Sequence, residues 1–381
     1  MKEHTIYKGR AKAEMYDELM DMLNYVFGFS SADYDFQKLL PKLYADKKQA
    51  CHDNYIVAEG GKIKAAVGAF DDIISVCGEE IKCRGIGNVA VHPYSRSKGY
   101  MIDCMNMSIN DMIEDGVDIS FLGGHRQRYG YFGFEDGCPR YNVRITTTSA
   151  HHYFKNVATE AVEIRDVSEN DTEIIDKIFA LYEKKPQRSI RPRDRFYQIL
   201  RSWTHQPRAF FIGGEFVGYG IGGINELTLT DIKYFDSVIH AFAQMHGDIN
   251  LGIPAWNTEL FEAALRVGDS PSINESYMLS VFNYKKVVGT LLKLKASLEP
   301  LQDGAVTVLI HGYAGDCKLK LSVVDGKSSV EDYDGEAEIE LSHKDAAKFF
   351  FGIHSPHWKK LTHATRAWLP LPLYVEDADH V

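Results

Sequence analysis

The sequence predicts an α/β protein with mixed sheets and more than one domain. At 381 residues the chain exceeds the usual size of a single domain, so two or three domains are expected. Apolar residues alternate with period two in some segments and recur at helical spacing in others. A glycine-turned hairpin pattern also occurs twice, at residues 55–65 (YIVAEGGKIKA) and 209–219 (AFFIGGEFVGY). This weak repeat predicts two copies of one fold.

The composition excludes several classes of protein. With 45% hydrophobic and 25% charged residues, the chain has the balance of a folded globular protein. Its net charge of -10 argues against nucleic acid as a partner, because phosphate binding requires a basic surface, and favours a cationic substrate. The polar N-terminus and the absence of an 18-residue apolar run predict neither export nor membrane insertion, so we expect a cytoplasmic protein.

Residues 1–152 are expected to form the first domain. Helical spacing runs through residues 12–48, and Gly116 is a natural end for a helix over 101–113. A Gly123-Gly124 break then precedes a short helix near 126–132. The strands expected in this domain lie at residues 55–58, 63–70, 73–82, 85–91 and 117–122.

Two further units follow. Residues 153–285 repeat the α/β pattern, with helices expected at 174–182, 194–203 and 258–267 and strands at 209–219 and 248–253. Residues 286–381 read as a small α+β domain, with strands at 307–310, 317–324 and 337–341 and a helix at 345–351. The acidic stretch 325–340 is more typical of a solvated edge than of a calcium loop.

Residues 89–100, VAVHPYSRSKGY, lead from a strand through a basic turn into a helix. The turn offers successive backbone N–H groups from Arg96 to Tyr100, Gly99 permits close approach, and Arg96 and Lys98 add positive charge. This arrangement could bind a pyrophosphate, although it matches neither a Walker A nor a Rossmann motif. The alternative is an ordinary turn with surface Arg and Lys side chains.

A second motif follows about 30 residues later. Residues 129–134 read YGYFGF, after the expected strand and the Gly123-Gly124 break. Together the two motifs resemble the acetyl-CoA site of the GCN5-related N-acetyltransferases (GNAT), with their V-x-V strand, Arg/Gln-x-x-Gly-x turn and Y-x-x-F-G-F/Y signature.

Over the full length, the chain resembles the enhanced intracellular survival (Eis) family of acetyltransferases. That resemblance implies a catalytic GNAT domain over 1–152, a degenerate GNAT copy over 153–285 and a sterol-carrier-protein-like domain over 286–381. Residues 124–134, GHRQRYGYFGF, are similar to the family stretch S-E-x-x-I-Y-G-R-F-G-Y. They depart from it at Gly124 and His125, which stand where Ser-Glu is usual.

The resemblance implies acetyl-CoA as the co-substrate, no metal, and direct acetyl transfer without a covalent enzyme intermediate. In such enzymes the V-x-V strand holds the pantetheine through its backbone. The cofactor-contacting positions carried over to this sequence are Val89, Ala90, Val91, Arg96, Ser97, Lys98, Gly99, Tyr100, Met101, Ile102, Gly124 and His125.

Acetyl transfer to an amine needs a base and an acid. An alkylamine has a pKa of about 10.4 and must lose a proton before attack, whereas the departing thiolate benefits from a proton donor. The resemblance implies Tyr129 as the general acid and the α-carboxylate of Val381 as the general base. Alternatives for these roles are Tyr131 for the acid and, near the base, Glu376, Asp377, Asp379 and His380.

The remaining reactive residues do not form a recognisable site. The six cysteines contain no CxxC pair, which argues against a zinc ribbon, and Cys104 is expected to be a packed thiol rather than a nucleophile. His151-His152 and the pair His354 and His357 have no further ligands at a metal-binding spacing. No metal is therefore expected.

The acceptor is left open by the sequence. The Eis resemblance implies aminoglycosides or other polycationic amines, and a homo-oligomer such as a hexamer. Alternatives are a protein lysine, a small metabolite amine, or a non-catalytic protein that binds acyl-CoA or a lipid. An open apolar tunnel in residues 286–381 would favour lipid binding, and a closed core that docks the C-terminal tail would favour the enzyme.

Overall fold

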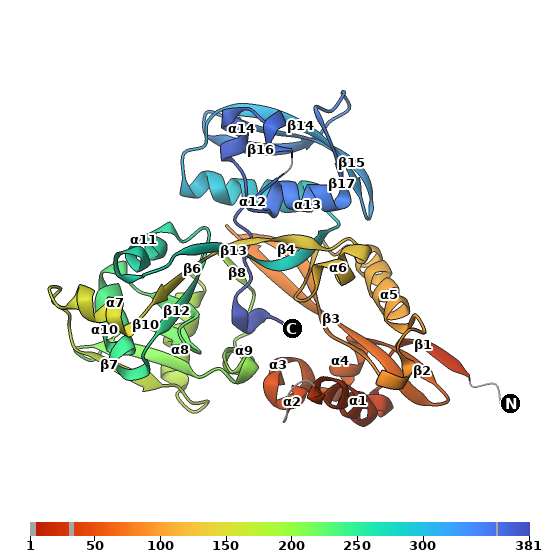
Figure 1. Ribbon diagram of the computed structural model, residues 1–381, viewed down its shortest axis with the longest axis horizontal. Coiled ribbons are helices and arrows are strands. Elements are labelled where there is room, and N and C mark those ends of the chain that lie inside the picture. The colour runs from red at the N-terminus through yellow and green to blue at the C-terminus, as the bar shows by residue number, and fades with distance from the viewer. Residues whose placement is uncertain (1–4, 30–33, 356) are drawn as a thin grey trace.

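The computed structural model describes residues 5–29, 34–355 and 357–381. Three sheets with their helices surround a central region in which the C-terminus ends (Figure 1). β1, the first described strand, lies at an outer edge of the molecule (Figure 1). This mixed α/β arrangement confirms the predicted fold class.

The first sheet has nine strands and runs β1-β2-β3-β4-β5-β13-β6-β12, with β8 paired to β3. Its pairs are antiparallel except for β4 and β5, which run parallel. The strands are β1 (Ile6–Arg10), β2 (Asn54–Glu59), β3 (Lys62–Val76), β4 (Glu79–Val91), β5 (Ile119–Leu122), β6 (Glu135–Ile145), β8 (Gln187–Ser189), β12 (Ile249–Pro254) and β13 (Ser272–Val281). The two strands expected at 63–70 and 73–82 are mainly one long strand, β3, because Asp71 and Asp72 remain in the ladder.

The helices near this sheet are α1 (Tyr16–Gly28), α2 (Phe36–Leu39), α3 (Pro41–Tyr44), α4 (Lys47–His52), α5 (Tyr100–Glu114) and α6 (Arg126–Tyr129). The helix expected at 101–113 is confirmed as α5. The helical spacing of 12–48 is divided among four helices, with Pro41 beginning α3, and residues 30–33 lie outside the described residues. Across the described part of the chain, no helix has the length and apolarity to cross a membrane.

The second sheet runs β11-β10-β9-β7, with all neighbours antiparallel. It contains β7 (Val162–Asp166), β9 (Pro207–Ile212), β10 (Glu215–Ile221) and β11 (Glu226–Leu229), with α7 (Thr147–Phe154), α8 (Thr172–Tyr182), α9 (Phe196–Leu200), α10 (Phe235–His246) and α11 (Thr258–Val267). β8, β12 and β13 also come from residues 153–285, yet they join the first sheet. The boundary at residue 152 therefore stays a prediction, since the two units share strands.

The third sheet runs β16-β15-β14-β17, and its helices α12 (Tyr284–Leu298) and α13 (His343–Phe351) lie toward the first sheet (Figure 1). It contains β14 (Gly304–Gly312), β15 (Gly315–Val324), β16 (Lys327–Asp332) and β17 (Ile339–Ser342), with α12, α13 and α14 (His363–Ala367). One apolar core joins this sheet, α12 and α13 to residues of β5 and β13, such as Ile119 and Leu279. The third unit thus holds the C-terminal tail against the first sheet.

Candidate functional site

The first feature of the site is the point where β4 and β5 separate. The two strands pair in parallel from Cys83 with Ile119 to Ile86 with Leu122, where β5 ends. β4 continues to Val91, and of the described strands only β3 pairs with it beyond Ile86. The other backbone edge of β4 is therefore open at Val89, Ala90 and Val91. An open strand edge presents N–H and C=O groups to an extended ligand.

A β-bulge at Asn88 marks the same point. The register of β3 and β4 shifts between the pairs Ala66–Ala90 and Gly68–Gly87, and Asn88 has φ of 40°. Its side chain donates to Asn54 Oδ1 at 2.8 Å and accepts from the Tyr44 hydroxyl at 3.1 Å. A bulge increases the local twist and so helps β4 leave β5. Asn88 was not among the predicted site residues, although an Asn inside an apolar strand is a signal of a positive φ.

The C-terminal tail is anchored in two stages. Its apolar half lies in the core of the third unit, where Trp368, Leu371 and Leu373 are buried. Its polar half is held mainly by cations of other elements. The bonds that fix it run from Arg191 to Asp379 at 2.7 and 2.9 Å, Lys185 to Glu376 at 2.7 Å, Arg140 to Asp377 at 3.2 Å and Lys42 to the Ala378 carbonyl at 2.7 Å.

This tail brings Val381 onto β4. A Cβ added to Gly87 would lie 2.8 Å from the carboxyl carbon of Val381, and one added to Gly85 would lie 2.6 Å from its Cγ2. Glycine at both positions therefore makes room for the chain terminus. The terminal carboxylate lies at the place where β4 leaves β5. None of the hydrogen bonds and ion pairs found among the described residues engages this carboxylate.

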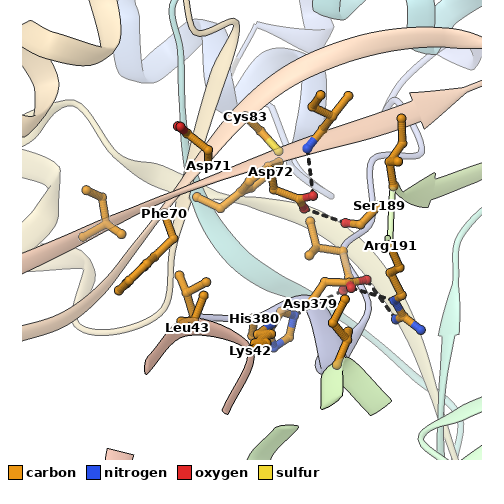
Figure 2. A pocket seen from close by; sticks show the side chains of 18 of the residues that line it. Lys42, Leu43, Phe70, Asp71, Asp72, Cys83, Ser189, Arg191, Asp379 and His380 are labelled. Carbon is orange, nitrogen blue, oxygen red and sulfur yellow. Dashed lines mark hydrogen bonds and ion pairs between the residues drawn. The ribbon is translucent and has the colours of Figure 1, made fainter. Parts of the chain in front are cut away.

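A cavity of about 390 Å³ opens beside Val381. Figure 2 shows how its walls are assembled from β3, from α3, from the segment after β8 and from the tail. Phe70 and Asp72 come from β3, whereas Asp379 lies below Asp72 in the view of Figure 2 and points to Arg191 on its right. The cavity thus joins segments separated by more than 300 residues along the chain.

Burial shifts the charges around this cavity toward neutrality. The pKa of Asp72 is raised to about 6 by burial and by the neighbouring Asp379, although the Ser189 hydroxyl donates to it at 2.6 Å. Burial lowers the pKa of Lys42 to about 8 and that of His380 to about 3. The His380 imidazole is therefore neutral near pH 7.

Tyr129 lies close to the divergence but does not line the cavity. The Tyr129 ring packs on Gly124. A Cβ added to Gly124 would lie 2.7 Å from Tyr129 Cε2, so glycine makes room for the ring at the position where the family stretch has Ser. Tyr129 is 6% exposed and shares a core with Ile86 and Leu122, which do line the cavity. Burial raises its pKa, so the hydroxyl keeps its proton near pH 7. Tyr131 is 72% exposed.

The basic turn has the geometry of an anion site. Ser97 and Gly99 adopt φ of 66° and 81°, and α5 then begins at Tyr100 without a side-chain cap. Uncapped N–H groups at a helix start favour an anion. Lys98 already bonds Glu59 at 2.8 Å, whereas Arg96 is exposed and takes part in none of the ion pairs found among the described residues.

The other predicted cofactor positions surround this turn and the end of β5. Met101 is half-buried and Ile102 exposed in the first turn of α5, while Gly124 and His125 are exposed just before α6. Their contacts with a cofactor stay predictions. Burial raises the pKa of Cys104 to about 12 and that of Cys83 well above its usual value, so both thiols stay protonated. In the described ranges no group of three or more His, Cys, Asp or Glu side chains could hold a metal.

Comparison with known proteins agrees with this geometry. Residues 9–137 match the family described as acetyltransferase (GNAT) domain. The chain carries a GNAT acetyltransferase domain. The GNAT match spans β1 to β5 and the start of β6, and it therefore includes the divergence, the basic turn and Tyr129. A search of curated proteins finds no match.

Solved structures are similar in fold over nearly the full length of the chain. An Enterococcus faecalis V583 protein described as "Probable N-Acyltransferase" matches with a TM-score of 0.68 and 18% identity over 98% of this chain and 99% of that one. A GCN5-related N-acetyltransferase from Anabaena variabilis gives 0.67 and 16% over 97% and 96%. Eis1 from Mycobacterium abscessus gives 0.64 and 12% over 97% and 96%. At these identities the likeness establishes a shared fold.

Proposed function

We propose that the protein transfers an acetyl group from acetyl-CoA directly to a primary amine. The observation that carries the proposal is the position of the Val381 carboxylate, which lies on Gly87 where β4 leaves β5. A carboxylate in the wall of a cavity, without a cation bound to it, is suited to accept a proton from an incoming ammonium. The neutral amine is then the nucleophile.

Acetyl-CoA is proposed to bind at two segments with open backbone groups, the free edge of β4 and the start of α5. The pantetheine arm is proposed to lie along Val89 to Val91, and the pyrophosphate at the uncapped start of α5, with Arg96 supplying positive charge. A backbone N–H at the divergence then polarises the thioester carbonyl. This arrangement directs the acetyl end of the cofactor toward Gly87 and Val381.

The transfer itself has three proton movements. The terminal carboxylate takes a proton from the acceptor ammonium, and the amine nitrogen forms a bond to the acetyl carbon. The bond between that carbon and the CoA sulfur then breaks, and Tyr129 donates its hydroxyl proton to the departing thiolate. The nitrogen loses its second proton as the amide forms, and this proton restores the Tyr129 hydroxyl through water. The protonated state of Cys83 and Cys104 supports direct transfer over an acyl-cysteine intermediate.

The packed core of the third unit argues against the lipid-binding alternative. Residues of α12, α13, β14 and β15 fill this core together with Trp368, Leu371 and Leu373 of the tail. Such packing gives the third unit a role in docking the tail, which supports the enzyme. The test is release of CoA thiol from acetyl-CoA with aminoglycosides, polyamines, lysine peptides and simple alkylamines as acceptors. Binding of acetyl-CoA without release by any amine would overturn the proposal.

Tyr129→Phe is expected to lower kcat by about a hundredfold, because general acid catalysis typically contributes 10² or more. The same assay measures the effect with the best acceptor. Tyr131→Phe is the matched variant, since Tyr131 is the alternative acid; because Tyr131 is exposed, this variant should retain full activity. Equal kcat values for the two variants would exclude Tyr129 as the acid.

Arg96→Gln is expected to raise KM for acetyl-CoA by about tenfold, because a charge-assisted hydrogen bond to phosphate is lost. Lys98→Gln should have a smaller effect, since Lys98 is already bonded to Glu59. Initial rates at varied acetyl-CoA concentration measure both changes. A larger effect of Lys98→Gln would assign the phosphate contact to Lys98 instead.

A further inference from the structure

We propose that the acceptor is a primary amine carried on an apolar body, with no second positive charge. This inference rests on the proposed function and identifies the substrate class of the same site. It departs from the polycationic acceptors that the resemblance implies. Three features of the cavity carry it: its apolar walls, the balance of its charges, and the distance between its two carboxylates that form no ion pair among the described residues.

The walls of the cavity are mainly apolar. They come from helices α3 and α9, from strands β3, β4 and β5, from the segment after β8 and from the tail. The apolar side chains that line it include Leu43, Phe70, Ile73, Phe121, Ile190 and Ile199. Such walls favour a hydrocarbon body, since each buried methylene improves binding about fourfold.

Some of the charges at the cavity are already paired, and those left balance in sign. Two guanidinium nitrogens of Arg191 donate to Asp379, and Arg84 donates to Asp71 at 2.5 Å. The carboxylates left are those of Asp72 and Val381, and the cations Lys42 and Arg195 also line the cavity. A polycation would find no surplus of negative charge, whereas a single ammonium can be received by the Val381 carboxylate.

His380 adds no charge to the cavity. It lies between Val381 and the rest of the tail, and its Nδ1 accepts from the Tyr277 hydroxyl while its Nε2 donates to the Val375 carbonyl at 3.3 Å. Both ring nitrogens are thus engaged, and the low pKa of His380 keeps the ring neutral. The tail therefore contributes one available charge to the cavity, the terminal carboxylate.

The strand register gives the orientation of the acceptor. Asp72 lies opposite Cys83 on β4, whereas the Val381 carboxylate lies over Gly87, four residues further along that strand. At the usual rise per residue this separation is about 13 Å. Phe70 on β3 and Phe121 on β5 both pair with Gly85 of β4, which lies between the positions of the two carboxylates. The amine then points to Val381 and its body lies over these two rings.

The first test compares straight-chain acceptors in the thiol-release assay. From butylamine to octylamine, kcat/KM is expected to rise by two- to fourfold per methylene until the cavity is filled. Diaminooctane, of the same length as octylamine, is expected to be at least tenfold poorer, and kanamycin poorer still. Higher kcat/KM for diaminooctane or kanamycin than for octylamine would overturn the inference and leave the proposed function standing.

The second test changes one wall residue. Ile190→Asp adds a carboxylate to the wall, and it should reduce kcat/KM for octylamine while improving that for diaminooctane. Ile273→Asp is the matched control, because Ile273 is a similarly exposed isoleucine outside the cavity wall, at 50% against 37% exposure for Ile190. An unchanged ratio of octylamine to diaminooctane in Ile190→Asp would place the acceptor elsewhere and contradict the inference.

A binding measurement separates the inference from the catalytic proposal. Calorimetric titration of the wild-type protein with octylamine and with diaminooctane is expected to give the tighter Kd for octylamine. Tighter octylamine binding without thiol release would reject the catalytic proposal but retain the apolar amine site. Equal or weaker octylamine binding would reject the inference whatever the assay gives.

Discussion

Deletion of Val381 is expected to lower kcat by at least a hundredfold and to leave the Kd for acetyl-CoA within about twofold of wild type. The deletion moves the terminal carboxylate back by one residue, or about 3.4 Å, away from its position over Gly87. A general base must lie within hydrogen-bond reach of the proton that it removes, and its loss typically costs 10² to 10⁴ in rate. Stopped-flow or steady-state thiol release measures kcat, and calorimetry measures acetyl-CoA binding.

Two further variants separate the carboxylate from the Val381 side chain. Addition of one glycine after Val381 keeps the side chain but moves the carboxylate, and it should reduce kcat as the deletion does. Val381→Ala keeps the carboxylate and shortens the side chain above Gly85, so kcat should fall by less than tenfold. Full activity in the extended protein would show that the terminal carboxylate is not the base.

The second large effect is expected at Arg191, the main anchor of the tail. Arg191 is buried, with its side chain 1% exposed, and it contacts both Asp379 and Glu226. Arg191→Met leaves these two buried carboxylates without that partner, which costs about 3–5 kcal/mol for a broken buried pair. Urea unfolding should report this loss of stability. Arg165→Met is the control, because Arg165 pairs with Glu163 at the surface and should leave the unfolding midpoint unchanged.

Arg191 is also a positioning residue for Val381. Release of Asp379 frees the last residues of the tail, so Arg191→Met should lower kcat at least tenfold under conditions where the protein stays folded, with acetyl-CoA affinity retained. Arg191→Lys should recover part of kcat, since Lys restores the charge without the two-point contact. A stability loss with unchanged kcat would limit Arg191 to a structural role.

Local patterns predicted the elements of the proposed cofactor site. The strand, basic turn and helix of residues 85–113 are present as β4, the turn and α5, and the repeated hairpins are β2–β3 and β9–β10. These features depend on neighbours in the chain, since strand alternation, a glycine turn and a helical stripe are each short-range patterns. Asn88 was missed because the bulge depends on Tyr44 and Asn54, which lie more than 30 residues away.

The sequence by itself determined the α/β class and the basic turn between a strand and a helix. Only the tertiary structure decided that β8, β12 and β13 enter the first sheet and that Val381 meets Gly85 and Gly87. It also decided that Arg191 holds Asp379. The physical reason is that strand order and buried ion pairs arise from contacts between residues far apart in the chain, which no local periodicity encodes.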